Sequence, residues 1–131
     1  MPNVFLGPGN NTYTAVPGDT VYGEGGNDTL RADAGGSRLY GGEGDDVVQG
    51  GAGADTIIGD DSTGAMGLNV LKGGGGNDVI ISYSWYDQVD AGAGDDTVNT
   101  YAQQTGQSMD GGTGTDTIYM RSLAGSTLSA R

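Results

Sequence analysis

Residues 73–81 read Gly-Gly-Gly-Gly-Asn-Asp-Val-Ile-Ile. We number the positions of this unit one to nine: a six-residue turn that ends in aspartate, then three extended residues with an aliphatic one at position eight. The turn occurs six times, and an aliphatic residue always follows its aspartate two places later. Such internal repeats decide a fold. The six turns are residues 23–28, 41–46, 50–55, 73–78, 91–96 and 111–116, and their position-eight residues are Leu30, Val48, Ile57, Ile80, Val98 and Ile118.

The apolar period continues outside the six turns. It is nine residues long, with one gap of fourteen between Ile57 and Leu71 and one of eleven between Val98 and Met109. All the positions it selects are apolar in a chain that is only 34% hydrophobic, so chance is a poor explanation. The full series is Val21, Leu30, Leu39, Val48, Ile57, Leu71, Ile80, Val89, Val98, Met109 and Ile118.

This period predicts an all-β solenoid. Glycine-rich turns allow positive φ and close backbone approach, and the three residues after each turn are mostly β-branched and alternate inward and outward. One unit cannot form a core alone and must stack on its neighbours. We expect two units per rung, with strands on opposite sides, and about six rungs spaced by about 4.8 Å. We expect one domain over 1–131, with a cap and a degenerate first unit in 1–22, repeats in 23–119 and a cap or tail in 120–131.

Composition indicates that hydrophobic burial alone does not hold this fold. The chain has 28 glycines, which lose much entropy on folding, and a net charge of −12. Its five basic residues are scattered, which excludes nucleic acid as a partner and disfavours anionic membrane surfaces. An acidic, glycine-rich chain could be a disordered tail, but the regular aliphatic period argues against that.

Divalent cations would resolve the conflict between charge and folding. Fifteen of the seventeen acidic residues are aspartates, and the chain has no histidine and no cysteine. Hard oxygen ligands without nitrogen or sulfur favour Ca²⁺ over zinc, copper or iron. The same absences exclude a Ser-His-Asp triad, a thiol nucleophile and a His-Glu-x-x-His zinc helix. We therefore expect a non-enzymatic chain, which could be the non-catalytic module of a larger secreted enzyme.

These motifs are similar to the Gly-Gly-x-Gly-x-Asp-x-aliphatic-x nonapeptides of the RTX (repeats-in-toxin) family, over roughly residues 14–119. The resemblance implies a right-handed parallel β-roll. Ca²⁺ would lie between turns of successive rungs on the same side, held by turn carbonyls and the motif aspartates. It also implies export by Gram-negative bacteria through type I secretion, with folding in extracellular calcium.

By this resemblance each ion needs two well-formed turns two units apart. Turns 50–55, 73–78, 91–96 and 111–116 are consecutive on one side and imply three sites. Turns 23–28 and 41–46 imply one on the other side. Four ions would change the net charge from −12 to −4. Asp60 and Asp61 in the insertion either complete a fifth site above Asp46 or belong to a solvated acidic loop. The implied metal residues are Gly23, Gly25, Gly26, Asp28, Gly41, Gly42, Glu43, Gly44, Asp46, Gly50, Gly51, Ala52, Gly53, Asp55, Asp60, Asp61, Gly73, Gly74, Gly75, Gly76, Asp78, Ala91, Gly92, Ala93, Gly94, Asp96, Gly111, Gly112, Thr113, Gly114 and Asp116.

Three departures from the family pattern affect these turns. Ala91 replaces the first glycine of its turn and Glu24 the second glycine of another, and a carbonyl ligand survives both if the backbone angles do. Ser37 stands where an aspartate belongs, so unit 32–40 should be metal-free or weak. Asp19, after Pro17 and Gly18, belongs to a degenerate first turn.

Units 59–72, 82–90 and 100–110 lack the glycine signature and fall on one side of the predicted stack. Their bulky residues either fill space or form a recognition surface; they are Met66, Tyr83, Trp85, Tyr86 and Tyr101. The leading hypothesis is a calcium-dependent folding and secretion-assisting module. The alternatives are a cell-surface adhesion or polysaccharide-binding module, of the surface-layer or alginate-enzyme accessory type, and ice binding, for which the outward turn residues are too mixed.

Overall fold

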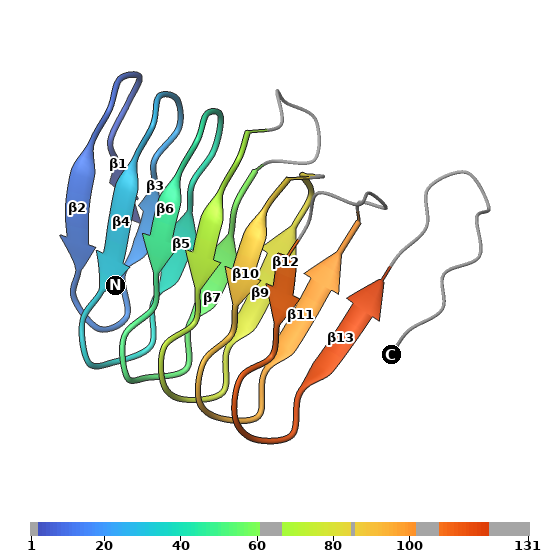
Figure 1. Ribbon diagram of the computed structural model, residues 1–131. Helices are drawn as coiled ribbons and strands as arrows, with labels where there is room; N and C mark the ends of the chain where they lie inside the picture. Colours follow the sequence, from blue (N-terminus) through green and yellow to red (C-terminus); the bar gives the residue numbers. More distant parts are fainter. Residues whose placement is uncertain (1–2, 61–66, 85, 102–107, 121–131) are drawn as a thin grey trace.

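The computed structural model describes residues 3–60, 67–84, 86–101 and 108–120 (Figure 1). The described residues form thirteen strands and no helix, so they contain no helix long and apolar enough to cross a membrane. The strands are β1 (Asn3–Phe5), β2 (Thr12–Ala15), β3 (Thr20–Tyr22), β4 (Thr29–Ala32), β5 (Arg38–Tyr40), β6 (Val47–Gln49), β7 (Thr56–Ile58), β8 (Val70–Lys72), β9 (Val79–Ser82), β10 (Gln88–Asp90), β11 (Thr97–Thr100), β12 (Ser108–Asp110) and β13 (Thr117–Met120).

Successive strands alternate between two parallel sheets. One sheet has the order β1-β3-β5-β7-β9-β11-β13, and the other has the order β12-β10-β8-β6-β4-β2. Figure 1 shows the two sheets as opposite walls of a solenoid, with a turn at every crossing between them. This arrangement confirms the predicted all-β parallel β-roll with two units per rung.

The apolar period sets the pairing register. Position-eight residues pair with one another along each sheet, as Ile57 with Ile80 and Ile80 with Val98. Val48 pairs with Leu71 and Leu71 with Val89 on the opposite sheet, so the fourteen-residue gap does not disturb the register. In the sequence the insertions fall between strands, and the described strands on either side stay aligned.

The first residues of the chain build strands of the same kind. Val4 of β1 pairs with Val21, and Tyr13 of β2 pairs with Leu30. Both side chains pack against the buried core. The pairing of the sheets therefore begins at Asn3.

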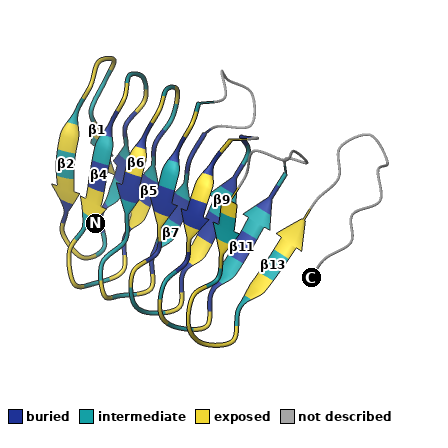
Figure 2. Cartoon of the chain, in the orientation of Figure 1, coloured by how far each residue is buried: buried dark blue, intermediate teal, exposed yellow. Residues whose placement is uncertain are grey.

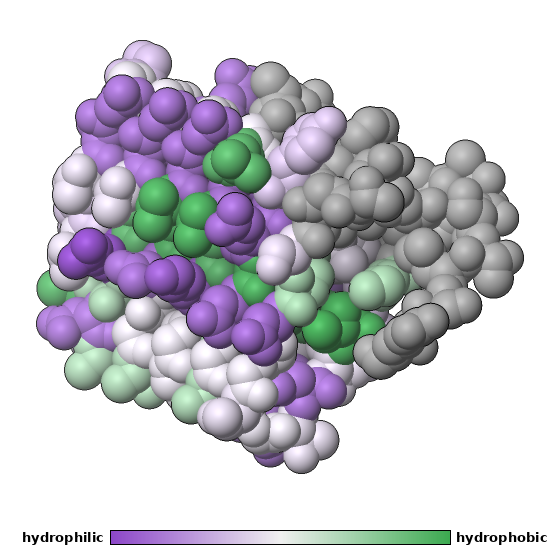
Figure 3. All heavy atoms as spheres, viewed as in Figure 1, coloured by the Kyte–Doolittle hydropathy of each residue, from purple (hydrophilic) through white to green (hydrophobic). Residues whose placement is uncertain are grey.

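The core is formed by aliphatic residues of both sheets, mainly those at position eight, and in Figure 2 the buried residues form a band across the strands. Most of its members are completely buried, whereas residues on either side of them in each strand are half-buried or exposed. Figure 3 shows hydrophilic residues gathered over the turns at the top of the stack, and a smaller hydrophobic patch over the strands below. Such a narrow core makes the turns important for stability.

The turns form two stacks, one at each end of the strands in Figure 1. We call those before the even-numbered strands the upper turns and those before the odd-numbered strands the lower turns. Turns 23–28 and 41–46 are upper turns, and turns 50–55, 73–78, 91–96 and 111–116 are lower turns. The predicted division of turns between the two sides is therefore the observed one.

Candidate metal centres

Five of the six motif aspartates are buried, and Asp116 of the last turn is half-buried. Asp28, Asp46, Asp55, Asp78 and Asp96 are each no more than 1% exposed. Each immediately precedes a strand whose position-eight side chain faces the core, so the same register that buries the aliphatic residues buries the carboxylates. Burying a charged carboxylate is costly unless it gains hydrogen bonds, a counter-charge or a metal ion.

One oxygen of each carboxylate is bonded to the neighbouring rung. The backbone N–H at position six donates to Oδ1 of the position-six residue in the next rung, with N···O distances between 2.7 and 3.0 Å. We call this series the inner ladder. In the lower turns it runs from Ser37 through Asp55, Asp78 and Asp96 to Asp116, and in the upper turns from Asn11 through Asp28, Asp46 and Asn69 to Asp87.

The second oxygen is left without a partner in four of these aspartates. Oδ2 of Asp28, Asp46, Asp78 and Asp96 is buried and accepts no hydrogen bond. Desolvation raises the pKa of all four carboxyl groups, to about 6 for Asp46 and to about 7 for Asp78. A buried acceptor without a donor is rare in native proteins and calls for an explanation such as a missing ion.

Three of the unpartnered oxygens, those of Asp28, Asp46 and Asp78, lie beside a position-one glycine and a carbonyl oxygen of the next rung. A Cβ placed on Gly41 would lie 2.5 Å from Oδ2 of Asp46 and 2.6 Å from the carbonyl oxygen of Gly59 in the next rung. The same crowding occurs at Gly73, between Oδ2 of Asp78 and the carbonyl oxygen of Ala91. Glycine at position one thus leaves room for a set of oxygen acceptors without N–H or O–H donors. Such a set fits Ca²⁺.

Backbone conformation supports these sets of oxygen acceptors. Positions two and four have positive φ, as at Gly42 (101°) and Gly44 (122°), and the same holds in turns 73–78, 91–96 and 111–116. Glu24 takes the position-two conformation with φ of 77°, so its substitution for glycine keeps the turn geometry. Ala91 is buried at position one, and Gly92 and Gly94 of its turn keep positive φ, so this substitution also preserves the conformation of the turn.

Turn 50–55 differs although its sequence carries the whole motif. Gly51 and Gly53 lie outside the left-handed region. The N–H of Gly51 donates to Oδ2 of Asp55 over 2.8 Å, so both carboxylate oxygens of Asp55 are hydrogen-bonded. Ser37, in the turn that precedes it in the stack, donates its N–H to Asp55 and contributes no carboxylate.

Asp60 of the insertion is also buried. Its Oδ2 accepts from the side-chain amide of Asn69 at 2.7 Å and its Oδ1 from the N–H of Gly67 at 3.1 Å. Desolvation raises its pKa to about 7, and the nearby carboxylates of Asp87 and Asp46 add to the shift. Asp60 therefore lies close to Asp46, while Asp61 lies outside the described residues.

Sequence reasoning missed the position-six residues of the irregular turns. Asn69 and Asp87 are completely buried members of the inner ladder. Asn69 stands two residues before Leu71, and Asp87 stands two residues before Val89. This spacing from the apolar period is the sequence signal that would have identified them. Among the described residues no cluster of three or more acidic side chains could hold a metal by itself, so a bound ion must use turn carbonyls.

Comparison with known protein families agrees with this geometry. The family model of the RTX calcium-binding nonapeptide repeat matches the chain in four copies, at residues 18–39, 33–62, 63–84 and 86–103. The chain belongs to this family. Its repeats are RTX calcium-binding repeats folded as a β-roll, and no curated protein matches the chain.

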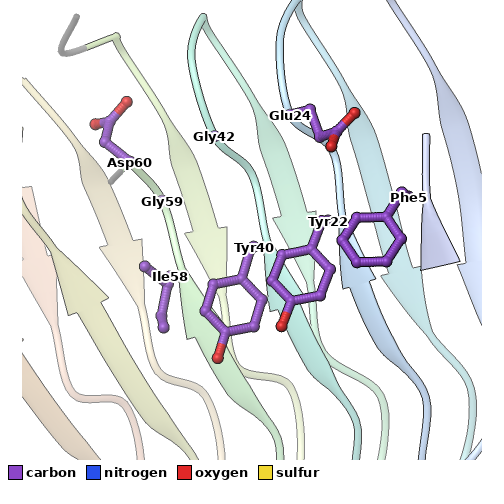
Figure 4. Close-up of a pocket in the computed structure, with 8 residues that line it drawn as sticks. All are labelled: Phe5, Tyr22, Glu24, Tyr40, Gly42, Ile58, Gly59 and Asp60. Carbon is purple, nitrogen blue, oxygen red and sulfur yellow. The ribbon is translucent and has the colours of Figure 1, made fainter. Parts of the chain in front are cut away.

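A second surface feature of this RTX chain is a column of aromatic residues at position nine (Figure 4). The rings of Phe5, Tyr22 and Tyr40 stack in parallel on successive strands, with centroids 4.8 and 4.7 Å apart. Ile58 continues the column, and together these residues line a groove of about 270 Å³ with Glu24 and Asp60 at its turn side.

The predicted aromatic surface on the irregular side is only partly within the described residues. Tyr83 and Tyr101 stack with ring centroids 4.8 Å apart, and Tyr86 is 57% exposed. Met66 and Trp85 lie outside the described residues. The column at position nine was not predicted, although Tyr22 and Tyr40 stand one place after the core residues Val21 and Leu39.

Proposed function

We propose that this chain is a calcium-dependent folding module of a protein secreted by a Gram-negative bacterium. It would remain unfolded at low cytosolic calcium, pass through a secretion channel and fold outside the cell. The observation that carries the proposal is the buried, unpartnered Oδ2 of Asp28, Asp46, Asp78 and Asp96, which in the first three lies beside a turn carbonyl.

The energetic argument starts from the cost of the metal-free fold. Each buried acceptor left without a partner costs roughly 1–3 kcal/mol, and more when it is charged. Four such groups are comparable with the whole stability of a typical domain, about 5–15 kcal/mol. A net charge of −12 adds self-repulsion, and the aliphatic core is too thin to compensate. The metal-free chain is therefore expected to be largely unfolded near neutral pH.

Calcium would remove these costs. When bound, the ion supplies positive charge and accepts carboxylate and carbonyl oxygens as ligands. The Oδ2 atoms of the four aspartates would hold it, together with carbonyls such as those of Gly41, Gly59 and Ala91. Since the site forms only when successive turns are stacked, binding free energy becomes folding free energy.

Calcium concentration would then decide where the chain folds. Calcium sites of extracellular modules typically have dissociation constants of about 10⁻⁴–10⁻³ M. Sites of that affinity stay empty in the cytosol and fill outside the cell. We propose no catalytic role, since the sequence has neither histidine nor cysteine and its repeat aspartates are committed to turns.

The test is a calcium titration followed by circular dichroism and calorimetry. We expect little β structure in EDTA, cooperative folding in calcium in the range of about 0.1–1 mM, and no folding in magnesium at the same concentration. Asp78→Asn should raise the calcium concentration needed for folding. Asp90→Asn, which removes the same charge from an exposed strand residue, should not. A spectrum and melting temperature that EDTA leaves unchanged would reject the proposal.

The aromatic groove supports a second candidate function, binding of an extracellular polysaccharide. Phe5 is 62% exposed at the start of the column, and aromatic side chains provide apolar contact area for sugar rings. The acidic charge of the chain favours a neutral glycan over an acidic one. Retention on immobilised neutral glycans that is lost in Phe5→Ala but kept in Val79→Ala would support it. If Phe5→Ala and Val79→Ala were retained equally, binding of a polysaccharide by the aromatic groove would be rejected.

A further inference from the structure

A second series of hydrogen bonds joins the turns, and it starts from position five. The N–H of Asp45 donates to Oδ1 of Asn27 at 3.0 Å, and the N–H of Asp95 donates to Oδ1 of Asn77 at 2.9 Å. We call this series the outer ladder, because its members are exposed. Its other bonds run from the N–H of Asn27 to Asn10, from Leu68 to Asp45 and from Thr115 to Asp95.

The two ladders run in opposite directions. In the inner ladder a side chain accepts from the preceding rung, and in the outer ladder a side chain accepts from the following rung. The rungs that contain Asp28 and Asp46 are thus joined by a reciprocal pair of bonds. The outer-ladder bond needs an Asn or Asp at position five as its acceptor. The other residue types found at position five in the described turns have no side-chain carbonyl or carboxylate oxygen.

The outer ladder coincides with the unpartnered carboxylates. Oδ2 is unpartnered in four position-six aspartates, and every one of them follows an Asn or Asp that accepts an outer-ladder bond. These pairs are Asn27 with Asp28, Asp45 with Asp46, Asn77 with Asp78 and Asp95 with Asp96.

Buried position-six aspartates without such a neighbour have Oδ2 occupied by a donor of their own turn. Oδ2 of Asp55, which follows Ala54, accepts from the N–H of Gly51. Oδ2 of Asp19 accepts from the N–H of Val16, and Oδ2 of Asp87 accepts from Oγ of Ser82. Oδ1 of Asp19 is buried without a partner, but it is the inner-ladder oxygen, whose donor would come from the preceding rung. The residues before these two aspartates are Gly18 and Tyr86, neither of which can accept the outer bond.

The physical link is the conformation of the turn. An outer-ladder bond, whether accepted as by Asn77 or only donated as by Thr115, fixes position five against a neighbouring rung. Turns joined in this way keep positive φ at positions two and four, as in Gly74 and Gly76. Without such a bond, turn 50–55 departs from that conformation and directs the N–H of Gly51 onto Asp55. A carboxylate oxygen that already accepts this bond has to lose it before it can bind an ion.

We propose that the residue at position five decides whether the aspartate after it is available to calcium. The inference rests on the proposed calcium binding at the turns and adds which turns take part. Ions would bind beside Asp28, Asp46, Asp78 and Asp96. Turn 50–55 would bind none despite its complete motif. Turn 41–46 would bind one against Gly59, although the turn that follows it in the stack has lost the motif.

Native mass spectrometry in calcium tests this by counting bound ions. We expect four ions on the wild-type chain and on Asp55→Asn, because Asp55 holds none. Asn77→Ala should carry three ions, and Asn77→Asp should restore four, since aspartate also accepts the outer bond. Ala54→Asn should add a fifth ion, whereas the control Ala52→Asn, at exposed position three of the same turn, should not.

Different failures are distinguishable. A wild-type chain that folds with no bound ion overturns both the proposed function and this inference. A wild-type chain that binds calcium, but loses an ion in Asp55→Asn or keeps four in Asn77→Ala, overturns the role of position five alone. If Asn77→Ala does not fold, the unchanged count expected for Asp55→Asn and the added ion expected for Ala54→Asn still decide the matter.

Discussion

The backbone N–H of Asp78 donates a 2.8 Å hydrogen bond to Oδ1 of Asp96, one rung further along the stack. Each of these aspartates therefore has one carboxylate oxygen fixed by protein and, at Oδ2, one that is buried without a partner. This division separates two contributions to stability. The inner ladder needs only an oxygen acceptor, which asparagine also supplies, whereas ion binding needs the charge.

The substitution Asp78→Asn isolates the second contribution. Asparagine keeps the acceptor for the N–H of Asp55 but removes the charge, as Asn69 already does in the inner ladder of the upper turns. We expect the stability in saturating calcium to fall by about 2 kcal/mol or more, while the metal-free chain is not destabilised. Urea unfolding in calcium measures the first effect, and the β content in EDTA by circular dichroism, which should be no lower than in the wild-type chain, measures the second, with Asp90→Asn as the charge-matched control.

If Asp78→Asn destabilised the chain equally in calcium and in EDTA, the aspartate would have only a structural role.

Without calcium, stability should fall as pH rises. The pKa is raised to about 7 in Asp78 and Asp60 and to about 6 in Asp46, from an ordinary value of 3.8, chiefly by burial. Between pH 3.8 and the raised pKa values, the folded chain binds more protons than the unfolded chain. The free energy of unfolding in EDTA therefore decreases from about pH 4 to pH 7. Circular dichroism across this range should show β structure in acid that is lost toward neutrality.

In saturating calcium this pH dependence should become weaker, because the ion takes the place of the proton on the same carboxylates of the folded chain. The calcium concentration at half-folding should fall as the pH is lowered from 7 to 6, since the folded chain gains protons there that the unfolded chain does not bind. Asp78→Asn should flatten both profiles, and Asp90→Asn should leave them unchanged. A metal-free chain that gains stability from pH 4 to pH 7 would contradict the sign worked out here.

The strands could be predicted because their signal is redundant. The apolar period before and after the insertion fixes the position of a residue such as Leu71. A register shift of one residue would move every side chain of the strand to the opposite face of the sheet. The conformation of turn 50–55 could not be predicted in the same way. Its motif positions, the three glycines at positions one, two and four and the aspartate at position six, match those of turn 73–78. Its geometry depends on Ala54 at the variable position five and on the turn before it in the stack, which the motif does not specify.

The aromatic column shows another limit of motif reading. Tyr22 and Tyr40 look unrelated in the sequence, since they are 18 residues apart. They become neighbours only when each rung is known to contain two units, because position nine then recurs on the same sheet one rung later. The pairing, and with it the column, follows from the topology and not from the motif.

The aliphatic core should be sensitive to truncation. Ile80 is completely buried and pairs with Ile57 and Val98. Ile80→Ala should cost about 2–5 kcal/mol in calcium. Because each strand contributes mainly one side chain to the core, few neighbouring atoms can move in to fill the cavity. Val79→Ala, at a position 37% exposed on the same strand, should cost much less. Urea unfolding at saturating calcium measures both, and equal losses would show that the position-eight residues do not form the main apolar core.

Glycine at position two should be harder to replace than glycine at position three. Gly42 has φ of 101°, and a Cβ there would clash with the backbone carbonyl of Glu24 in the previous rung. A Cβ on Gly25 would meet only Pro8, at 3.9 Å. Gly42→Ala should therefore cost at least the 1–2 kcal/mol of left-handed strain and weaken calcium-induced folding, whereas Gly25→Ala should be nearly neutral. Calcium titrations followed by circular dichroism compare the two variants; matching midpoints would mean that stacked turns can separate without losing the sites.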